Sequence, residues 1–431
     1  MIKYTYLFAI TTAYLLGACA SRKYVDKQRE TQIIIENQSS VKLTDKAIAI
    51  KRSSIKRIPL GINYPVVVSS NNDTIPSQLD DLNEDKNWDE LFMVVNLEAN
   101  SKSVYTLTWV SNPPKYTVRT SVRFGKRPSI NAPVMPATSE TVLKNELPKA
   151  LGFQRYQTDG PSWENDKVGF RHYLDGRNSK DVFGKKISGM SPEDVGIGEK
   201  GAVEDNYHVM KDWGRDILAV GNSIGIGGVA LSEGDRLMRL GVTITDSVNN
   251  VKKTDFNIVS EGPVRSILKF DYQNWKPLNK NYQVTETTSI WPGMYAFHNS
   301  VKISGISGKE NLALGIVNIN AAKPPTEIKV NDEWIAIISH DRHGYNKEWL
   351  IGLALLVPAK SYINYTEAPK TGQLATSYMV NLKIANNVPV NYFAIAGWEI
   401  SDKGFSKEDY FKAYVLNLAA QITVPVTVKV N

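Results

Sequence analysis

Cysteine is nearly absent from this chain, because Cys19 is the only one among 431 residues. A lone cysteine cannot form an internal disulfide, and it excludes metal sites built from several cysteines. The HEXXH, CxxC, GxSxG, GxGxxG and Walker patterns are also missing. The sequence therefore carries no familiar motif of a zinc protease, a serine hydrolase or a nucleotide-binding enzyme.

Internal repeats and helical periodicity are scarce as well. No repeat with a period of about 20 to 50 residues is visible, which argues against a propeller or a solenoid. With 42% hydrophobic and 22% charged residues, the composition is that of a globular protein. It excludes disordered, collagen-like and multi-span membrane chains.

The net charge of +7 is distributed unevenly. Basic residues outnumber acidic ones mainly within residues 22–57, and the remainder of the chain is close to neutral. A membrane or wall surface explains a short basic stretch as well as nucleic acid does. The segments richest in aromatic residues carry as many acids as bases, so we expect no nucleic-acid partner.

The N-terminus has the pattern of an exported lipoprotein. Lys3 precedes an apolar run from Tyr4 to Leu16 that is too short to span a bilayer, and the run ends in LLGAC. This ending resembles the lipobox of bacterial lipoproteins, so we predict a signal peptide over residues 1–18 and lipid attachment at Cys19. The expected location is the periplasm or the outer membrane and cell surface, with a lipid anchor in the outer or inner membrane. A buried N-terminal helix with a core cysteine is the alternative.

Most of the remaining sequence alternates with period two, as in NYPVVVSS, SVYTLTWV and NYQVTETTSIW. Such runs predict a mostly β fold of antiparallel sheets, with one sandwich domain over residues 46–431 after a basic tether over residues 19–45. The best helix candidate is Ser406 to Ile422, with Ser406 as its N-cap. Residues 153–228 are rich in Gly, Asp, Trp, Tyr and His, and we expect them to form functional loops over one face.

Two further patterns favour structural interpretations. HDRH places His340 and His343 three residues apart, but it follows a strand-like run and precedes a glycine, so a polar turn is favoured over a metal site. The glycine-dense GNSIGIGG (residues 221–228) lacks the Lys-Ser/Thr ending of a phosphate loop. A tight turn or close backbone packing is the better explanation for it.

Two segments combine aromatic rings, carboxylates, an arginine and an imidazole. They are DGPSWENDKVGFRHY (residues 159–173) and NYHVMKDWGRD (residues 206–216). Flat rings can stack on sugar C–H faces while charged groups reach hydroxyls and carboxylates, so these segments predict a sugar site. Buried Trp and Tyr residues in a β core, with surface charges around them, are an equally good explanation of the composition.

The same residues carry a family resemblance. PSWENDKVGFRHY, NYHVMKDWGRDILAVGNSIGIGG and EGPVRSILKFDYQNW resemble the domain-of-unknown-function 4861 family of lipoproteins from Bacteroidota polysaccharide-utilisation loci, and the likeness covers roughly residues 60–420. The resemblance implies a galactose-mutarotase-like β-supersandwich. It also implies an activity seen in the family, the dehydration of a non-reducing-end uronic acid in oligosaccharides of the algal polysaccharide ulvan, which contains sulfated rhamnose.

This chemistry requires a base for the C5 proton, an acid for the departing 4-hydroxyl and a group that neutralises the substrate carboxylate. It requires no metal or organic cofactor. We assign His208 and Tyr173 to proton transfer and Arg171 to the carboxylate, with Asn165 or His298 as substitutes for Arg171. The expected sugar platforms are Trp163 and Tyr207, and Glu164 or Asp216 would orient the histidine or bind hydroxyls.

Three alternatives remain open from the residues alone. A polysaccharide lyase would use the same acid and base while splitting the chain. A glycoside hydrolase would use two carboxylates that flank the bond, for which Glu164 and Asp216 are candidates. A glycan-binding lipoprotein would perform no chemistry.

Overall fold

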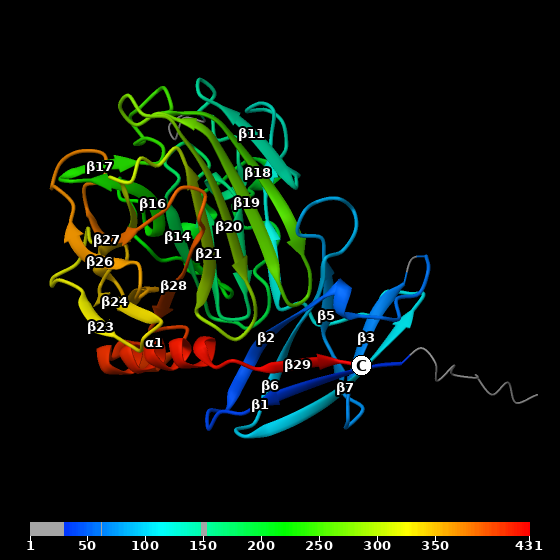
Figure 1. The fold of residues 1–431 in the computed structure, drawn as a ribbon. Coiled ribbons are helices and arrows are strands. Elements are labelled where there is room, and N and C mark those ends of the chain that lie inside the picture. Colours follow the sequence, from blue (N-terminus) through cyan, green and yellow to red (C-terminus); the bar gives the residue numbers. More distant parts are fainter. Residues whose placement is uncertain (1–29, 62, 148–152) are drawn as a thin grey trace, which may run out of the picture.

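The computed structural model describes residues 30–61, 63–147 and 153–431. The chain is mostly β, with several antiparallel sheets in a sandwich-like arrangement and few helices (Figure 1). Every pair of strands within these sheets is antiparallel in the described ranges. The fold class predicted from the period-two runs is confirmed.

A small sandwich is formed by the first strands of the described chain and its last one. One sheet has the order β29-β1-β7-β3-β4 and the other has the order β2-β6-β5. The strands are β1 (Thr31–Asn37), β2 (Leu43–Lys51), β3 (Tyr64–Ser69), β4 (Thr74–Ile75), β5 (Ser77–Asp80), β6 (Glu90–Leu97), β7 (Ser101–Val110) and β29 (Thr427–Val430). Ile33 and Ile35 are fully buried in a hydrophobic cluster of this sandwich alone.

This sandwich corrects two predictions. The tether cannot extend through residue 45, because β1 alternates buried and exposed side chains and pairs with β7 and β29. The single domain expected over residues 46–431 instead contains two sandwich-like units, each with its own main hydrophobic cluster, and a small cluster of Phe92, Val94 and Val264 joins them. Strand β1 is difficult to recognise in the sequence because it is short and polar residues such as those at 37–40 adjoin it. One of its partners, β29, lies at the other end of the sequence.

The larger unit is built on a nine-stranded sheet with the order β11-β18-β19-β20-β21-β28-β25-β24-β23. Its strands are β11 (Ser139–Leu143), β18 (Val251–Glu261), β19 (Ser266–Trp275), β20 (Tyr282–Ile290), β21 (Ala296–Ser304), β23 (Thr326–Lys329), β24 (Trp334–Asp341), β25 (Ile351–Pro358) and β28 (Val390–Trp398). β20 follows the alternation expected of a half-buried strand.

Two five-stranded sheets complete the core of this unit. The first has the order β15-β14-β13-β12-β8 and the second β17-β16-β22-β27-β26. Their strands are β8 (Thr120–Arg123), β12 (Ser162–Asn165), β13 (Val168–His172), β14 (Lys180–Lys185), β15 (Gly214–Asp216), β16 (Ile226–Glu233), β17 (Arg236–Arg239), β22 (Asn311–Val317), β26 (Tyr362–Glu367) and β27 (Ser377–Lys383). Side chains of all three sheets share one hydrophobic cluster. A separate two-stranded sheet joins β9 (Gly125–Lys126) to β10 (Met135–Pro136).

Residues 153–228 are therefore not a loop excursion, because strands β12 to β15 and the start of β16 lie within them. The longest part of this segment outside the named strands is residues 186–213, which connect β14 to β15 and contain two short 3-10 helices. The Gly, Asp and Trp content of residues 153–228 led to the loop prediction. Strands β12 to β15 were missed because they are short and carry charged residues on one face.

Helix α1 (Glu408–Thr423) confirms the one helix that the sequence predicts. Phe411, Val415 and Ala419 recur every four residues and are buried against strands of the nine-stranded sheet. Its cap differs from the prediction, because Lys407 occupies the N-cap position without a side-chain hydrogen bond, and the Ser406 hydroxyl donates to the carbonyl of Lys403. No helix in the described part of the chain is long and apolar enough to cross a membrane.

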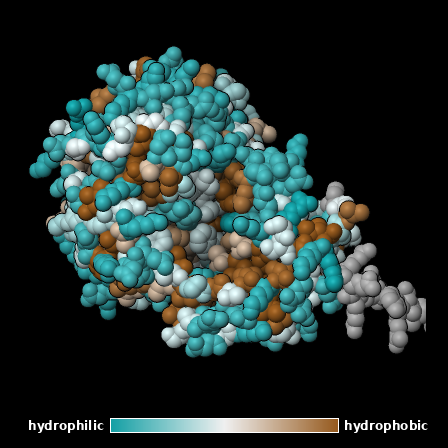
Figure 2. All heavy atoms as spheres, viewed as in Figure 1, coloured by the Kyte–Doolittle hydropathy of each residue, from teal (hydrophilic) through white to brown (hydrophobic). Residues whose placement is uncertain are grey.

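Polar contacts and an apolar groove both lie where the two units meet. Arg119 bridges Asp45 of the small sandwich and Asp166 of the larger unit. Figure 2 shows a mostly hydrophilic surface on the visible face, with hydrophobic side chains gathered near this junction. The groove is lined by apolar side chains that include Trp291 and Phe393.

Candidate functional site

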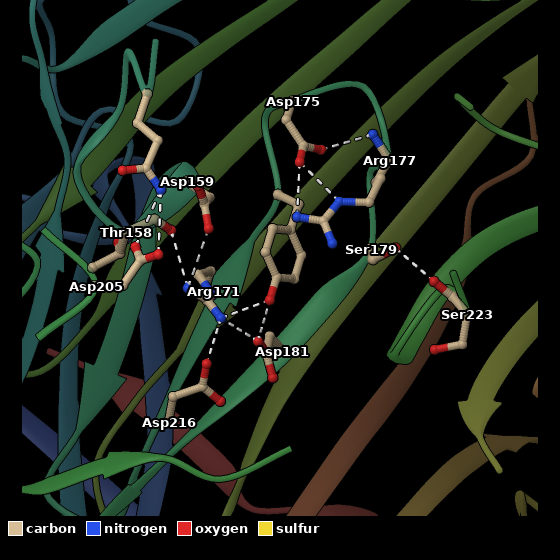
Figure 3. Close-up of polar contacts among 12 residues, drawn as sticks. Thr158, Asp159, Arg171, Asp175, Arg177, Ser179, Asp181, Asp205, Asp216 and Ser223 are labelled. Carbon is tan, nitrogen blue, oxygen red and sulfur yellow. Dashed lines mark hydrogen bonds and ion pairs between the residues drawn. The ribbon is translucent and has the colours of Figure 1, made fainter. Parts of the chain in front are cut away.

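Charged residues gather around Arg171 on the outer face of the sheet that contains β13 and β14 (Figure 3). Arg171 lies directly opposite Asp181 in the strand register, so both side chains point to the same face. The guanidinium donates to Asp216 at 2.7 Å and to Asp181, and it lies 3.7 Å from Asp159. Three carboxylates thus surround one buried cation.

His208 is the exposed member of this arrangement. It ends a short 3-10 helix (Asn206–His208), and its Nδ1 lies 3.5 Å from Oδ2 of Asp216. The side chain is 40% exposed, whereas Asp216 is fully buried. Burial lowers the pKa of His208, and the positive charge of Arg171 lowers it further. A half-exposed imidazole that is neutral near pH 7 can accept a proton from a bound molecule.

Tyr173 lies beneath the surface in the same cluster. Its hydroxyl accepts from Arg171 at 2.6 Å and donates to Asp181 at 2.6 Å. The Arg177 guanidinium covers its ring at 3.7 Å, and the residue is 4% exposed. Burial raises the pKa of Tyr173 well above its usual value. Tyr173 therefore belongs to the same cluster as Asp216, which contacts His208, but its hydroxyl lies between two charged partners and not at the surface.

Asp159 lies on a strained turn at the edge of the cluster. Thr158 and Asp159 both adopt left-handed backbone conformations, with φ of 51° and 60°. This conformation is costly for a β-branched residue such as Thr158, on the order of 1–3 kcal/mol, and strain of this kind gathers at functional sites. The Asp159 side chain is 23% exposed, and burial raises its pKa to about 6 while Arg171 opposes the shift.

Tyr345 is a neighbour of His208 that the sequence interpretation missed. Its ring meets the imidazole edge-on at 5.7 Å, and burial raises its pKa above the usual range of tyrosine. It follows the HDRH segment, so the aromatic residue directly after the glycine was the available signal. Asp159 was visible in the sequence cluster but received no role there.

Arg171 does not face a substrate as predicted. It is 1% exposed, and its side-chain partners are the carboxylates and the tyrosine of the cluster. Burial opposes the charge of Arg171, but Tyr173 and the carboxylates Asp181 and Asp216 raise its pKa well above the usual value. Arg171 holds the cluster together from below.

The predicted sugar platforms are wrong. Trp163 is fully buried and packs edge-on against Phe297 of the nine-stranded sheet, with ring centroids 5.4 Å apart. Strand alternation explains this, because Trp163 and its register partner Phe170 face the core while neighbouring positions face outward. Tyr207 is 1% exposed, and its hydroxyl donates to Asp205 at 2.8 Å.

Glu164 and Asn165 also have structural partners instead of open positions. Glu164 accepts from Lys185 and from the backbone and hydroxyl of Ser191. Asn165 donates to the carbonyls of Trp291 and Met294 and is fully buried. Asp216 is fully buried as well but contacts His208, so of these three only Asp216 acts on the predicted histidine.

His298 lies in a different environment. It is on β21, and its ring packs 5.0 Å from Phe393 and 6.4 Å from Trp291, which line the groove at the junction of the two units. Burial lowers its pKa to about 4. The structure therefore does not bring His298 to the cluster around Arg171. His172 is fully buried on the core side of β13, where burial lowers its pKa to about 3.

HDRH is not the polar turn that the sequence predicts, because His340 and Asp341 end strand β24 and both histidines are buried, whereas GNSIGIGG shows the predicted close backbone packing at Gly225. His340 bonds the carbonyl of Phe405 at 2.7 Å, and His343 bonds the hydroxyl of Ser339 at 3.0 Å. Within the described ranges, no group of three or more His, Cys, Asp or Glu side chains is placed to hold a metal ion. Gly225 has φ of 71° and packs against the Lys180 backbone so closely that a Cβ would lie 1.7 Å from its carbonyl oxygen.

The cluster around Arg171 lies within the part of the chain that matches a protein family. Residues 35–428 match the family described as Domain of unknown function (DUF4861). The chain belongs to the DUF4861 family. The match includes every residue of the cluster around Arg171, and it covers both sandwiches apart from the start of β1 and the end of β29.

Individual relatives are distant. The "Uncharacterized protein P7" of Formosa agariphila is 23% identical over 291 residues, which cover 64% of this chain and 68% of that protein. Among solved structures, a protein in the glycosyl hydrolase family 38 from Enterococcus faecalis has 8% identity and a TM-score of 0.49, and covers 93% of this chain. An alpha-mannosidase from Enterococcus faecalis V583 has 9% identity and a TM-score of 0.47, with the same coverage. This chain spans about half the length of both structures, 47% and 46%.

Proposed function

We propose that this protein is an oligosaccharide dehydratase that removes water across C4 and C5 of a non-reducing-end glucuronic or iduronic acid in ulvan-type oligosaccharides. The product is a 4,5-unsaturated uronate. The observation that carries the proposal is the half-exposed His208 beside the buried cluster of Arg171, Asp181 and Asp216. The family resemblance supplies the substrate class.

His208 is the proposed base for the C5 proton. Its lowered pKa keeps the imidazole neutral near pH 7, so it can accept a proton. Asp216 lies 3.5 Å from Nδ1 and can hold the orientation of the ring, which leaves Nε2 for the substrate. Once the imidazole is protonated, the carboxylates around Arg171 stabilise its charge.

The charges around the site are compatible with an acidic sugar. Arg171, Arg177 and Arg215 lie within or beside the cluster. Burial raises the pKa of both Asp159 and Asp216, which lowers the negative charge that a uronate would meet. Arg177 is a better candidate than Arg171 for the substrate carboxylate, because only one carboxylate, Asp175, pairs with it in the described structure.

The structure disfavours a glycoside hydrolase that uses Glu164 and Asp216. Both carboxylates are buried, and Glu164 is engaged by Lys185 and Ser191. A hydrolytic pair must flank the bond from both sides and leave room for water in an inverting enzyme. A lyase that splits the glycosidic bond uses the same base and remains the competing reaction.

Product analysis of ulvan oligosaccharides with a terminal uronate tests the proposal. Dehydration lowers the mass by one water, creates ultraviolet absorbance of a conjugated enol-ether acid and leaves the chain length unchanged. A lyase would give the absorbance with a shortened chain, and a hydrolase would shorten the chain without absorbance. An unchanged oligosaccharide would identify a binding protein and reject the proposal.

We further propose that the protein is anchored to a membrane by a lipid on Cys19, a residue outside the described part of the chain. The proposal rests on LLGAC. Labelled palmitate should enter the wild-type protein and not the Cys19→Ala variant. Equal incorporation into both proteins would reject lipid attachment at this residue.

A further inference from the structure

Asp159 has an environment unlike that of the other carboxylates around Arg171. Asp181 and Asp216 are buried and hydrogen-bonded to the guanidinium. Asp159 lies farther away at 3.7 Å, and its side chain is 23% exposed. Its carboxyl contacts Arg171 and also the Tyr207 hydroxyl, the latter at 3.5 Å, and both contacts involve Oδ2. Within the described residues, Oδ1 is the oxygen left for a ligand.

The backbone holds this carboxyl in place. Thr158 and Asp159 are left-handed, and Gly160 follows with φ of 152°. A Cβ on Gly160 would lie 2.1 Å from the carbonyl oxygen of His172, so the turn is packed directly against the end of β13. The Leu174 amide also donates to the Asp159 carbonyl at 2.9 Å. The turn is thus fixed from several sides, as expected where strain serves a function.

Three carboxylates around one guanidinium leave an excess of negative charge, which favours retention of a proton by one of them. Burial also raises the pKa of Asp216, but that carboxyl is fully buried, so Asp159, the partly exposed member of the three, is the one from which a proton can reach a ligand. Burial and the nearby charges of Asp175 and Asp205 raise its pKa to about 6, against Arg171 and Arg177. Pairs of titratable groups whose pKa values are pushed in opposite directions typically supply the acid and the base of a site.

We propose that Asp159 is the catalytic acid of this site and donates its proton to the departing 4-hydroxyl of the terminal uronate. The inference rests on the proposed dehydratase function. His208 removes the C5 proton, the electron pair of that C–H bond forms the C4–C5 double bond, and the C4–O4 bond breaks. O4 takes the Asp159 proton and leaves as water, after which solvent exchange returns the proton from His208 to Asp159.

The leaving group gives a sharp test of this role. Asp159→Asn keeps the size of the side chain, and Asn tolerates the left-handed backbone, so the variant should fold. On the natural 4-hydroxyl substrate it should lose about 10²–10⁴-fold in turnover. On a 4-deoxy-4-fluoro uronate, where fluoride leaves without an acid, it should stay within about tenfold of wild type. Asp332→Asn, at a surface position that is 98% exposed, is the matched control and should leave both rates unchanged.

Two results would overturn the assignment. Equal losses on the hydroxyl and fluoro substrates would show a structural role, and an undiminished rate on the hydroxyl substrate would show no role. An infrared difference titration, in which the spectra of Asp159→Asn are subtracted from those of the wild type, tests this inference separately from the proposed function because it needs no substrate. A carboxylic acid band of Asp159 that titrates near pH 6 supports the proton-holding acid, and a band absent above pH 4 rejects it. Failure of the wild type to dehydrate any uronate would instead reject the proposed function.

Discussion

Nδ1 of His208 lies 3.5 Å from Oδ2 of Asp216, the same oxygen that accepts a hydrogen bond from Arg171 at 2.7 Å. One carboxylate oxygen thereby links the half-exposed imidazole to the buried cation. Asp216 itself reaches this place because β15 pairs with β14, where Asp216 lies opposite Phe183 and on the same face as Asp181. From this arrangement we predict how activity and stability will change with pH and when His208, Asp159 or Arg171 is replaced.

Removal of the imidazole should abolish most of the activity. In His208→Ala, turnover of a terminal uronate should fall by about 10²–10⁴-fold, because the base for the C5 proton is lost. The side chain is 40% exposed, so the thermal unfolding temperature should change little. Val209→Ala is the adjacent control, since this side chain is 61% exposed. Wild-type turnover in a folded His208→Ala protein would contradict the assignment of the base.

The pH dependence should follow the two proposed proton carriers. His208 acts when neutral and its pKa lies below the usual 6.5, so activity should fall as the pH drops through that lowered value. Asp159 acts when protonated, so activity should also fall as the pH rises through about 6. The charged groups that face Asp159 are Arg171, Asp175, Arg177 and Asp205, and the neutral Tyr207 hydroxyl also faces it. The profile of kcat/KM should therefore be bell-shaped with a mildly acidic optimum. A rate that rises continuously up to pH 8 would be incompatible with this pair.

Replacement of Asp159 should stabilise the protein at neutral pH. Its pKa is raised from 3.8 to about 6 on folding, so the folded state binds more protons, and stability falls as the pH rises between these values. Asp159→Asn removes this penalty, which is roughly 1–3 kcal/mol after allowance for partial exposure. Urea unfolding should show a larger gain for the variant near pH 7 than near pH 4. A gain that is independent of pH would contradict the raised pKa.

Replacement of Arg171 should lower the stability of the folded protein more than it affects substrate binding. Arg171→Met leaves Asp181 and Asp216 buried without their cation, which typically costs about 3–5 kcal/mol. Adding Asp181→Asn to this variant should recover part of the lost stability, because one uncompensated charge is removed. Arg236→Met, at an exposed position, serves as the control. Chemical denaturation measures these differences, and a fully stable Arg171→Met protein would show that the cluster does not depend on its cation.

Part of the site could be anticipated from local patterns. The alternation in VGFRH places Phe170 and His172 on one face of β13 and Arg171 on the other, and the structure has this arrangement. The same rule applied to SWEN would have assigned Trp163 to the core. Its aromatic composition suggested a sugar platform instead, because composition does not distinguish an exposed ring from a buried one.

The sequence by itself determined the mostly β fold, the helix near the C-terminus, the family resemblance and the presence of His208, Tyr173, Arg171 and Asp216 in two site segments. These properties depend on local periodicity and on residue order, which a single chain displays. Only the tertiary structure decided that β29 completes the first sandwich, that Asp159 and Tyr345 lie beside the predicted residues, and that Arg171 is buried under three carboxylates. These relationships depend on strand pairing and on burial between segments far apart in the chain, because burial sets the pKa values that make one carboxyl an acid and one imidazole a base.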